Sequence, residues 1–183
     1  MPTDGLEVAL EAAARGDQAA IATIYRSLNP LLLRYLRHHV GQVADDVASE
    51  VWLGLAPQLA GFEGGWAELR ALMFMVARRR VIDHYRHDAR RKRAIEFDEA
   101  FELADGAETE ALAIGRIGAQ DAVEALVRCL PADQAEIVLL RVLGDLDVAR
   151  VAEIVGKSAG AVRIAQHRAL QRLKRSEMKA VTR

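Results

Sequence analysis

The chain has 183 residues, of which 51% are hydrophobic, and a formal net charge of -1, which suits one globular domain or two small ones. Charges interrupt the apolar runs well short of a membrane span and no export signal is visible, so we expect a cytoplasmic protein without membrane insertion. Cys129 is the only cysteine, which excludes an internal disulfide and a zinc site built on several thiolates, and its apolar neighbours predict that it lies in the core.

Helical spacing of apolar residues runs through the first half of the chain. Asp17 is suited to cap a helix that begins at Gln18, and Asn29 with Pro30 is expected to end it, because a residue before proline disfavours helical geometry. The last helix of this half carries two apolar stripes, which is typical of the central helix of a bundle. The predicted helices cover residues 6–14, 18–28, 31–40, 43–59 and 69–87.

That last helix becomes strongly basic at Arg78, shortly after a glycine-rich loop that carries Phe62 and Trp66. His84 and Tyr85 lie among the arginines, and this mixture of cations and rings suits both backbone phosphates and unstacked bases. The alternative is a solvated helix end whose cations complement the helix dipole. The number of cations and the nearby aromatic loop favour nucleic acid.

The sign of the net charge alternates along the chain. Residues 1–68, 69–93, 94–140 and 141–183 carry net charges of -5, +7, -9 and +6. Two basic segments separated by an acidic one predict two polyanion-binding surfaces, because phosphates respond to the local potential. Residues 94–117 are predicted to be an acidic linker, which is either a plain solvated tether or a segment that lies in a positively charged groove of a partner.

Helical spacing returns at about Ile117 and breaks at Pro131, after which Asp133 is expected to cap a helix from Ala135 to Leu143. The sequence therefore predicts an all-α protein. We expect two small helical bundles, at residues 1–93 and 118–183, joined by the acidic linker at 94–117.

A short amphipathic helix, a glycine and a capped basic helix lie between Asp147 and Lys174. Gly156 stands where a left-handed residue would end the first helix, and Ser158 can cap the second. The pattern predicts a helix-turn-helix, whose second helix places its first turns at base edges in the major groove. An ordinary surface hairpin with a charged face is the alternative. The candidate readers are Lys157, Ser158, Ala161, Arg163 and His167.

No set of residues indicates catalysis. Asp45, Asp46 and Glu50 could be mistaken for metal ligands, but no cluster of His, Asp or Glu elsewhere completes a coordination shell. No catalytic triad, phosphate-binding glycine loop or dinucleotide fingerprint is visible. We therefore expect no metal, no cofactor and no enzymatic activity.

Five blocks of sequence, in this order, resemble the bacterial RNA polymerase sigma factors of the extracytoplasmic-function class. The blocks are YRSLNPLLLRYLRHHVG, DDVASEVWLGL, GFEGGWAELRALMFMVARRRVIDHYR, LPADQAEIVLLRVL and VAEIVGKSAGAVRIAQHRALQRLK, and they cover nearly the whole chain. Members of this class keep only the second and fourth conserved sigma regions. The resemblance implies an alternative sigma factor that binds core RNA polymerase and directs promoter-specific initiation, while polymerase performs the chemistry.

The resemblance also implies a role for each segment. The linker would thread through polymerase toward the RNA exit channel. The segment docked on the polymerase clamp helices would include Asp46, Glu50, Val51 and Leu53. The melted minus-ten element would be bound by Phe62, Trp66, Arg78, Arg79, Arg80, Asp83, His84 and Arg86. The minus-thirty-five duplex would be read by Lys157, Ser158, Ala161, Arg163, Ile164, His167 and Arg168.

The chain departs from the usual family sequence at several positions. The family usually has Gln at the position of Ser49, Asn at Arg79 and Trp at Leu72.

Two other functions and a further partner are also considered. One alternative function is that of a sigma mimic, but a mimic needs no DNA-facing cations, so the retained arginines argue against it. The other is a helix-turn-helix repressor, which would dimerise and bind its operator without polymerase. The exposed apolar faces that docking requires predict an inhibitory anti-sigma protein that holds both domains.

Overall fold

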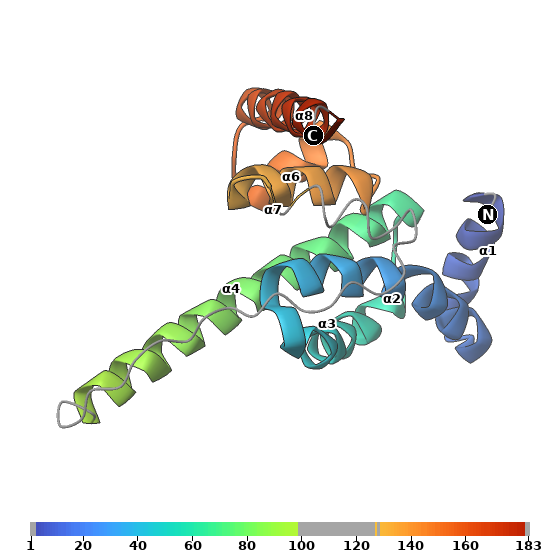
Figure 1. Ribbon diagram of the computed structural model, residues 1–183. Helices are drawn as coiled ribbons and strands as arrows, with labels where there is room; N and C mark the ends of the chain where they lie inside the picture. Colours follow the sequence, from blue (N-terminus) through green and yellow to red (C-terminus); the bar gives the residue numbers. More distant parts are fainter. Residues whose placement is uncertain (1–2, 99–126, 128, 182–183) are drawn as a thin grey trace.

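Helices make up most of residues 3–98, 127 and 129–181, which are the residues that this computed structural model describes (Figure 1). No strand occurs among them, and the predicted all-α fold is confirmed. Most of the expected acidic linker and the helix expected from Ile117 lie outside the described residues.

The first bundle is formed by α1 (Thr3–Ala14), α2 (Gln18–Val40), a 3-10 turn η1 (Gly41–Val43), α3 (Ala44–Leu59) and α4 (Trp66–Asp98). The first half of α4 contacts the other three helices, and its second half extends beyond them (Figure 1). Met73 and Phe74 of α4 are fully buried, and Phe74 meets the ring of Tyr35 edge-on at 5.4 Å. The prediction that α4 is central to this bundle is confirmed.

Helix α2 continues through Pro30, so the prediction that two helices meet there is wrong. Proline removes one helical hydrogen bond. The fully buried Ile24, Leu28 and Leu32 form one apolar face on both sides of Pro30, and their burial outweighs that loss. At the other end of α2 the predicted cap is confirmed, because the Asp17 carboxylate accepts the N–H of Ala19 at 2.8 Å.

The second bundle contains α6 (Ala132–Val142), α7 (Val148–Val155) and α8 (Ala159–Val181). Ile137 and Val162 are among its fully buried residues. The prediction that Asp133 caps a helix is wrong, because α6 begins at Ala132 and Asp133 lies in its first turn, 3.3 Å from Lys157. Pro131 precedes the helix, and its carbonyl accepts the N–H groups of Gln134 and Ala135, both at 2.9 Å.

Cys129 is exposed, although its sequence neighbours predicted a core position. Val127 and Leu130 on either side are buried. Cys129 lies in a turn, where neighbouring side chains point in different directions, so apolar neighbours alone do not bury it.

The two bundles pack against each other through α4 and the elements α6 and α7. Figure 1 shows α6 and α7 between α4 and α8, and α7 contacts α4 directly. Among the described residues, three ion pairs cross this boundary: Arg78 with Glu136 at 2.8 Å, Arg70 with Asp145 at 3.1 Å, and Arg150 with Glu68 at 3.2 Å. We call this packing the closed arrangement.

Candidate DNA-binding and partner-binding surfaces

The turn between α7 and α8 has the local geometry that the sequence predicts. Asp147 caps α7, and Gly156 ends it with a left-handed φ of 66°, where a side chain would be strained. Ser158 Oγ accepts the N–H of Ala161 at 3.2 Å and so caps the start of α8. These local bonds fix the angle at which α8 leaves α7.

Helix α8 is packed on one side and open on the other. Val162 and Ala169 are fully buried in the second bundle. Within the part of the chain that the structure describes, neither Arg163 nor Arg168 has a carboxylate partner. The seven residues predicted to read duplex DNA are all exposed: Lys157, Ser158, Ala161, Arg163, Ile164, His167 and Arg168. This face carries cations, a hydroxyl and an exposed apolar side chain, which are the kinds of group that read base edges in a major groove.

A second basic stripe lies on α4. Arg79, Asp83 and Arg86 follow each other at helical spacing and are exposed. Asp83 and Arg86 are 3.9 Å apart, and Arg80 lies 3.8 Å from Glu50 of α3. Because these pairs are solvent-exposed and weak, DNA phosphates can compete for the arginines.

Arg78, like Arg70 earlier in α4, faces the second bundle. Its Nε donates to Oε1 of Glu136 in α6 at 2.8 Å, and the hydroxyl of Tyr35 donates to the same oxygen at 3.3 Å. The Glu136 side chain is only 17% exposed, and Tyr35 is fully buried. Burial, with the carboxylate of Glu136, raises the pKa of Tyr35 well above its ordinary value, so its hydroxyl remains a donor.

The aromatic side chains before α4 are less accessible than the sequence suggested. Trp66 is 5% exposed, and its backbone N–H donates to Glu7 of α1 at 3.0 Å. Phe62 is half-buried against the core. A buried indole cannot stack on an unstacked base, so Trp66 is not part of the surface that this arrangement offers to DNA. His84 is half-buried and lies 3.6 Å from Asp88.

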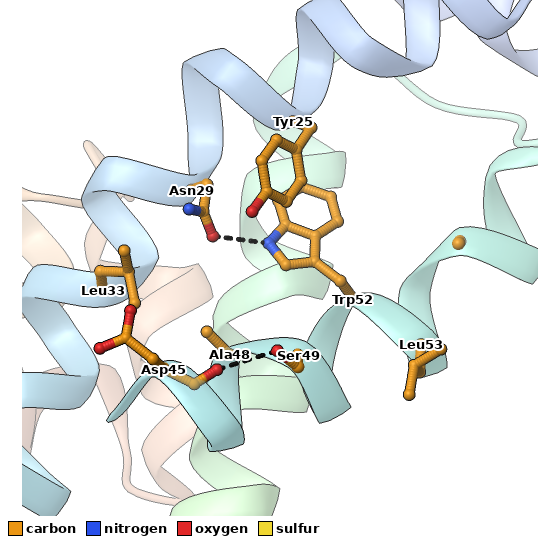
Figure 2. Close-up of a pocket in the computed structure, with 9 residues that line it drawn as sticks. Tyr25, Asn29, Leu33, Asp45, Ala48, Ser49, Trp52 and Leu53 are labelled. Atoms are coloured by element: carbon orange, nitrogen blue, oxygen red, sulfur yellow. Dashed lines mark hydrogen bonds between the residues drawn. The ribbon is translucent and has the colours of Figure 1, made fainter. Parts of the chain in front are cut away.

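A groove of about 500 Å³ lies between α2 and α3. Figure 2 shows the ring of Tyr25 beside that of Trp52, with centroids 5.0 Å apart, and the Trp52 indole N–H donating to Asn29 at 2.9 Å. The groove is lined by Tyr25, Asn29, Leu33, Asp45, Ala48, Ser49, Trp52, Leu53 and Ala56. An open groove with aromatic and aliphatic walls and a carboxylate at its edge suits a partner protein.

Of the four residues predicted to contact polymerase, Leu53 lines this groove and the other three do not. Asp46, Glu50 and Leu53 are exposed, and Leu53 retains 76% of its surface. Val51 is fully buried and belongs to the core. Sequence reasoning missed Tyr25 and Trp52, because only the packing of α2 on α3 brings their rings together.

His39, at the end of α2, is a second titratable group whose surroundings shift its pKa. Burial, with His38 and Arg78 as positively charged neighbours, lowers the pKa of His39 to about 4. Its ring packs on Tyr35 with centroids 4.5 Å apart. His39 is therefore a neutral packing residue at neutral pH, next to the contact between Arg78 and Glu136.

Two family models match the chain and divide it as the two bundles do. Residues 24–91 match Sigma-70 region 2, and residues 120–173 match Sigma-70, region 4. A region 2 bundle with a basic helix and a region 4 bundle with a helix-turn-helix define a transcription initiation factor of the sigma-70 type.

Curated relatives narrow this class. The chain is 34% identical over 182 residues to the ECF RNA polymerase sigma factor SigD of Mycobacterium bovis, which covers 95% of this chain and 84% of that protein. It is 32% identical over 176 residues to ShbA of Streptomyces griseus, also an ECF sigma factor, with 88% and 90% covered. The chain belongs to the ECF RNA polymerase sigma factors, and its function is that of an alternative sigma factor in promoter-directed transcription.

Solved structures share the fold. CnrH in complex with the cytosolic domain of CnrY has a TM-score of 0.60 at 18% identity, covering 95% of this chain and 97% of that one. RpoE of Bartonella quintana, solved with the anti-sigma factor NepR, has a TM-score of 0.60 at 22% identity, covering 89% and 98%. In the described ranges no helix is long and apolar enough to cross a membrane, and no group of His, Cys, Asp or Glu there could hold a metal ion.

Proposed function

We propose that this sigma factor reads the minus-thirty-five duplex with α8, captures the melted minus-ten strand with α4, and docks on core polymerase through α3. The observation that carries the proposal is the exposed face of α8, where Arg163 and Arg168 have no carboxylate partner among the described residues. Cations without internal partners bind phosphates and base edges at little cost. The chain then needs no catalytic residue of its own, and it acts in the cytoplasm, where polymerase meets the chromosome.

The minus-ten surface consists of exposed α4 residues, chiefly Arg79, Asp83 and Arg86. Unstacking a base costs a few kcal/mol, and a protein offsets this cost by binding the single-stranded form better than the duplex. Exposed guanidinium groups along one stripe can follow the backbone of such a strand. Phe62 is half-buried nearby, whereas Trp66 supports this surface from within the core.

The polymerase surface consists of the groove between α2 and α3 with its rim. Leu53 and the half-buried Trp52 provide apolar contact area, and Asp46 and Glu50 provide negative charge on the same helix. Aromatic residues at the centre of an interface contribute most of its binding energy, and rim charges add specificity. We infer that this groove receives helices of the polymerase largest subunit.

An anti-sigma protein is the second partner in this proposal. Leu53, Val142 and Ile164 are large apolar residues that remain exposed on the two bundles. The solved structures of CnrH and RpoE each contain a partner protein. The partner of RpoE is the anti-sigma factor NepR. We expect a single small protein to be recovered together with the chain from cell lysate. Addition of polymerase is expected to release that protein from the chain.

Run-off transcription with purified core polymerase on a genomic library tests the proposal. The full chain is expected to start transcripts at a small set of promoters, and a double R163A and R168A variant is expected to lose that selection. Arg26→Ala is the matched control, because Arg26 is an exposed arginine of α2 away from the proposed DNA surfaces. Unchanged start sites in the double variant would refute the role of α8.

A further inference from the structure

Arg78 and Tyr35 form an anion-binding site in the first bundle that the second bundle fills. Both donate to Oε1 of Glu136, from 2.8 Å and 3.3 Å. A half-buried guanidinium and a buried hydroxyl that converge on one oxygen are a recognition site for carboxylate or phosphate oxygens. The site favours an anion, because a permanently charged guanidinium and a hydroxyl donor point at the same position.

Further charge pairs align the same face of α4 with the second bundle. Arg70 is 16% exposed and contacts both the carboxylate and the backbone carbonyl of Asp145. Arg150 of α7 reaches Glu68 near the start of α4 at 3.2 Å. Each bundle thus contributes both cations and carboxylates to the boundary. This charge complementarity fixes the position of one bundle relative to the other.

The closed arrangement is incompatible with simultaneous binding of two promoter elements. Since α7 lies on α4 and α8 on α7, the axis of α8 is within roughly two helix-packing distances, about 20 Å, of α4. Elements about 25 base pairs apart are separated by roughly 85 Å of duplex at ~3.4 Å per base pair. The second bundle must therefore leave α4 when both elements are bound.

We propose that Glu136 acts as an internal anion that locks the unbound sigma factor in the closed arrangement, and that its departure makes the Arg78 and Tyr35 site available to a promoter phosphate. This proposal rests on the proposed function for the identity of the competing anion. The lock itself is a property of the free chain, so it is tested without polymerase.

The distance between the bundles is the first measurement. Spin labels at Gln58 of α3 and Gln171 of α8, both exposed, in a Cys129→Ser background report the closed arrangement in the full chain. Glu136→Gln keeps the shape of the side chain but removes its charge, and a shift of the distance distribution to longer values is expected. Asp133→Asn is the matched control, because Asp133 is on the same helix but pairs with Lys157 inside the second bundle.

A charge exchange distinguishes the lock from general loss of stability. The double variant R78E and E136R is expected to restore the short distance, because the pair is reversed but retained. If Glu136→Gln leaves the distance distribution of the wild type unchanged, the lock is refuted. If it lengthens the distance but the exchange does not restore it, the specific pairing is refuted.

Binding of single-stranded oligodeoxythymidylate is the second measurement, made by fluorescence anisotropy at low salt. Glu136→Gln is expected to raise the affinity of the free chain severalfold more than Asp133→Asn does. The additional Arg78→Gln substitution is expected to abolish that gain. No gain for Glu136→Gln over the control would refute the competition for Arg78, and this result would leave promoter selection by the holoenzyme intact.

Discussion

The two surfaces that we propose for DNA binding differ in what their cations face. On α8, Arg163 and Arg168 are exposed and have no carboxylate partner in the described ranges. On α4, Arg78, Arg80 and Arg86 each lie within 4 Å of a carboxylate, and the partner of Arg78 belongs to the other bundle. The cations of the proposed duplex reader are thus unengaged, whereas part of the proposed single-strand reader is engaged within the molecule.

The difference agrees with the role that we propose for each surface. A duplex reader meets DNA that is already in its binding form, so unengaged cations give binding at no conformational cost. A melting surface acts only after the duplex has opened, and internal carboxylates reduce its attraction for other polyanions until then. Substitutions in each bundle test how independent the two surfaces are.

Phe74→Ala is expected to produce the largest change, because it removes a fully buried ring from the helix that carries the melting surface. Such truncations cost about 3–5 kcal/mol of unfolding free energy. Chemical denaturation followed by circular dichroism measures the loss. The comparison predicts that α8 keeps its fold, so the amide exchange protection of Val162 should change much less than that of Tyr35. Equal loss at both residues would show that the bundles unfold as one unit.

A fall in pH is expected to lower the unfolding free energy of the first bundle, because His39 binds a proton more readily in the unfolded chain. Its pKa is about 4 in the folded chain and about 6.5 when unfolded, so the folded state binds fewer protons between these values. The associated stability is complete above pH 6.5 and is lost as the pH falls toward 4, by on the order of 3 kcal/mol. His39→Gln should therefore flatten the acid side of the stability profile. His167→Gln, at an exposed histidine of α8, should retain the wild-type slope.

Local patterns in the sequence were sufficient for most of the helices and for the turn between α7 and α8. The Gly156 turn and the Ser158 cap depend on neighbours a few residues away, and the sequence shows them directly. The burial of Trp66 and the pairing of Arg78 depend on α1 and α6, which are far away in the chain. Residue types and spacing do not show whether a cation faces solvent or a distant carboxylate, so the closed arrangement was not predictable.

Arg163→Ala and Arg79→Ala compare the two surfaces in the holoenzyme. Loss of a base-reading or phosphate-binding arginine costs about 1–3 kcal/mol of binding free energy. We expect Arg163→Ala to weaken promoter binding and melting together, and Arg79→Ala to weaken melting alone. Filter binding and permanganate reactivity of the minus-ten bases measure the two steps. Lys174→Ala, at an exposed cation later in α8, is the control. Weaker duplex binding by Arg79→Ala would contradict the division of roles.

Ser158→Ala is expected to have the smallest effect, because it removes one capping hydrogen bond at the start of α8. Loss of a serine cap costs about 1 kcal/mol. Ser49→Ala makes the same change inside α3, where the hydroxyl donates to the Asp45 carbonyl within the helix. Because alanine is the better residue in a helix interior, Ser49→Ala should be neutral or slightly stabilising. Thermal melts of both variants separate the cap from the loss of a hydroxyl. The same small loss for both would mean that the cap does not hold the first turn of the reading helix in place.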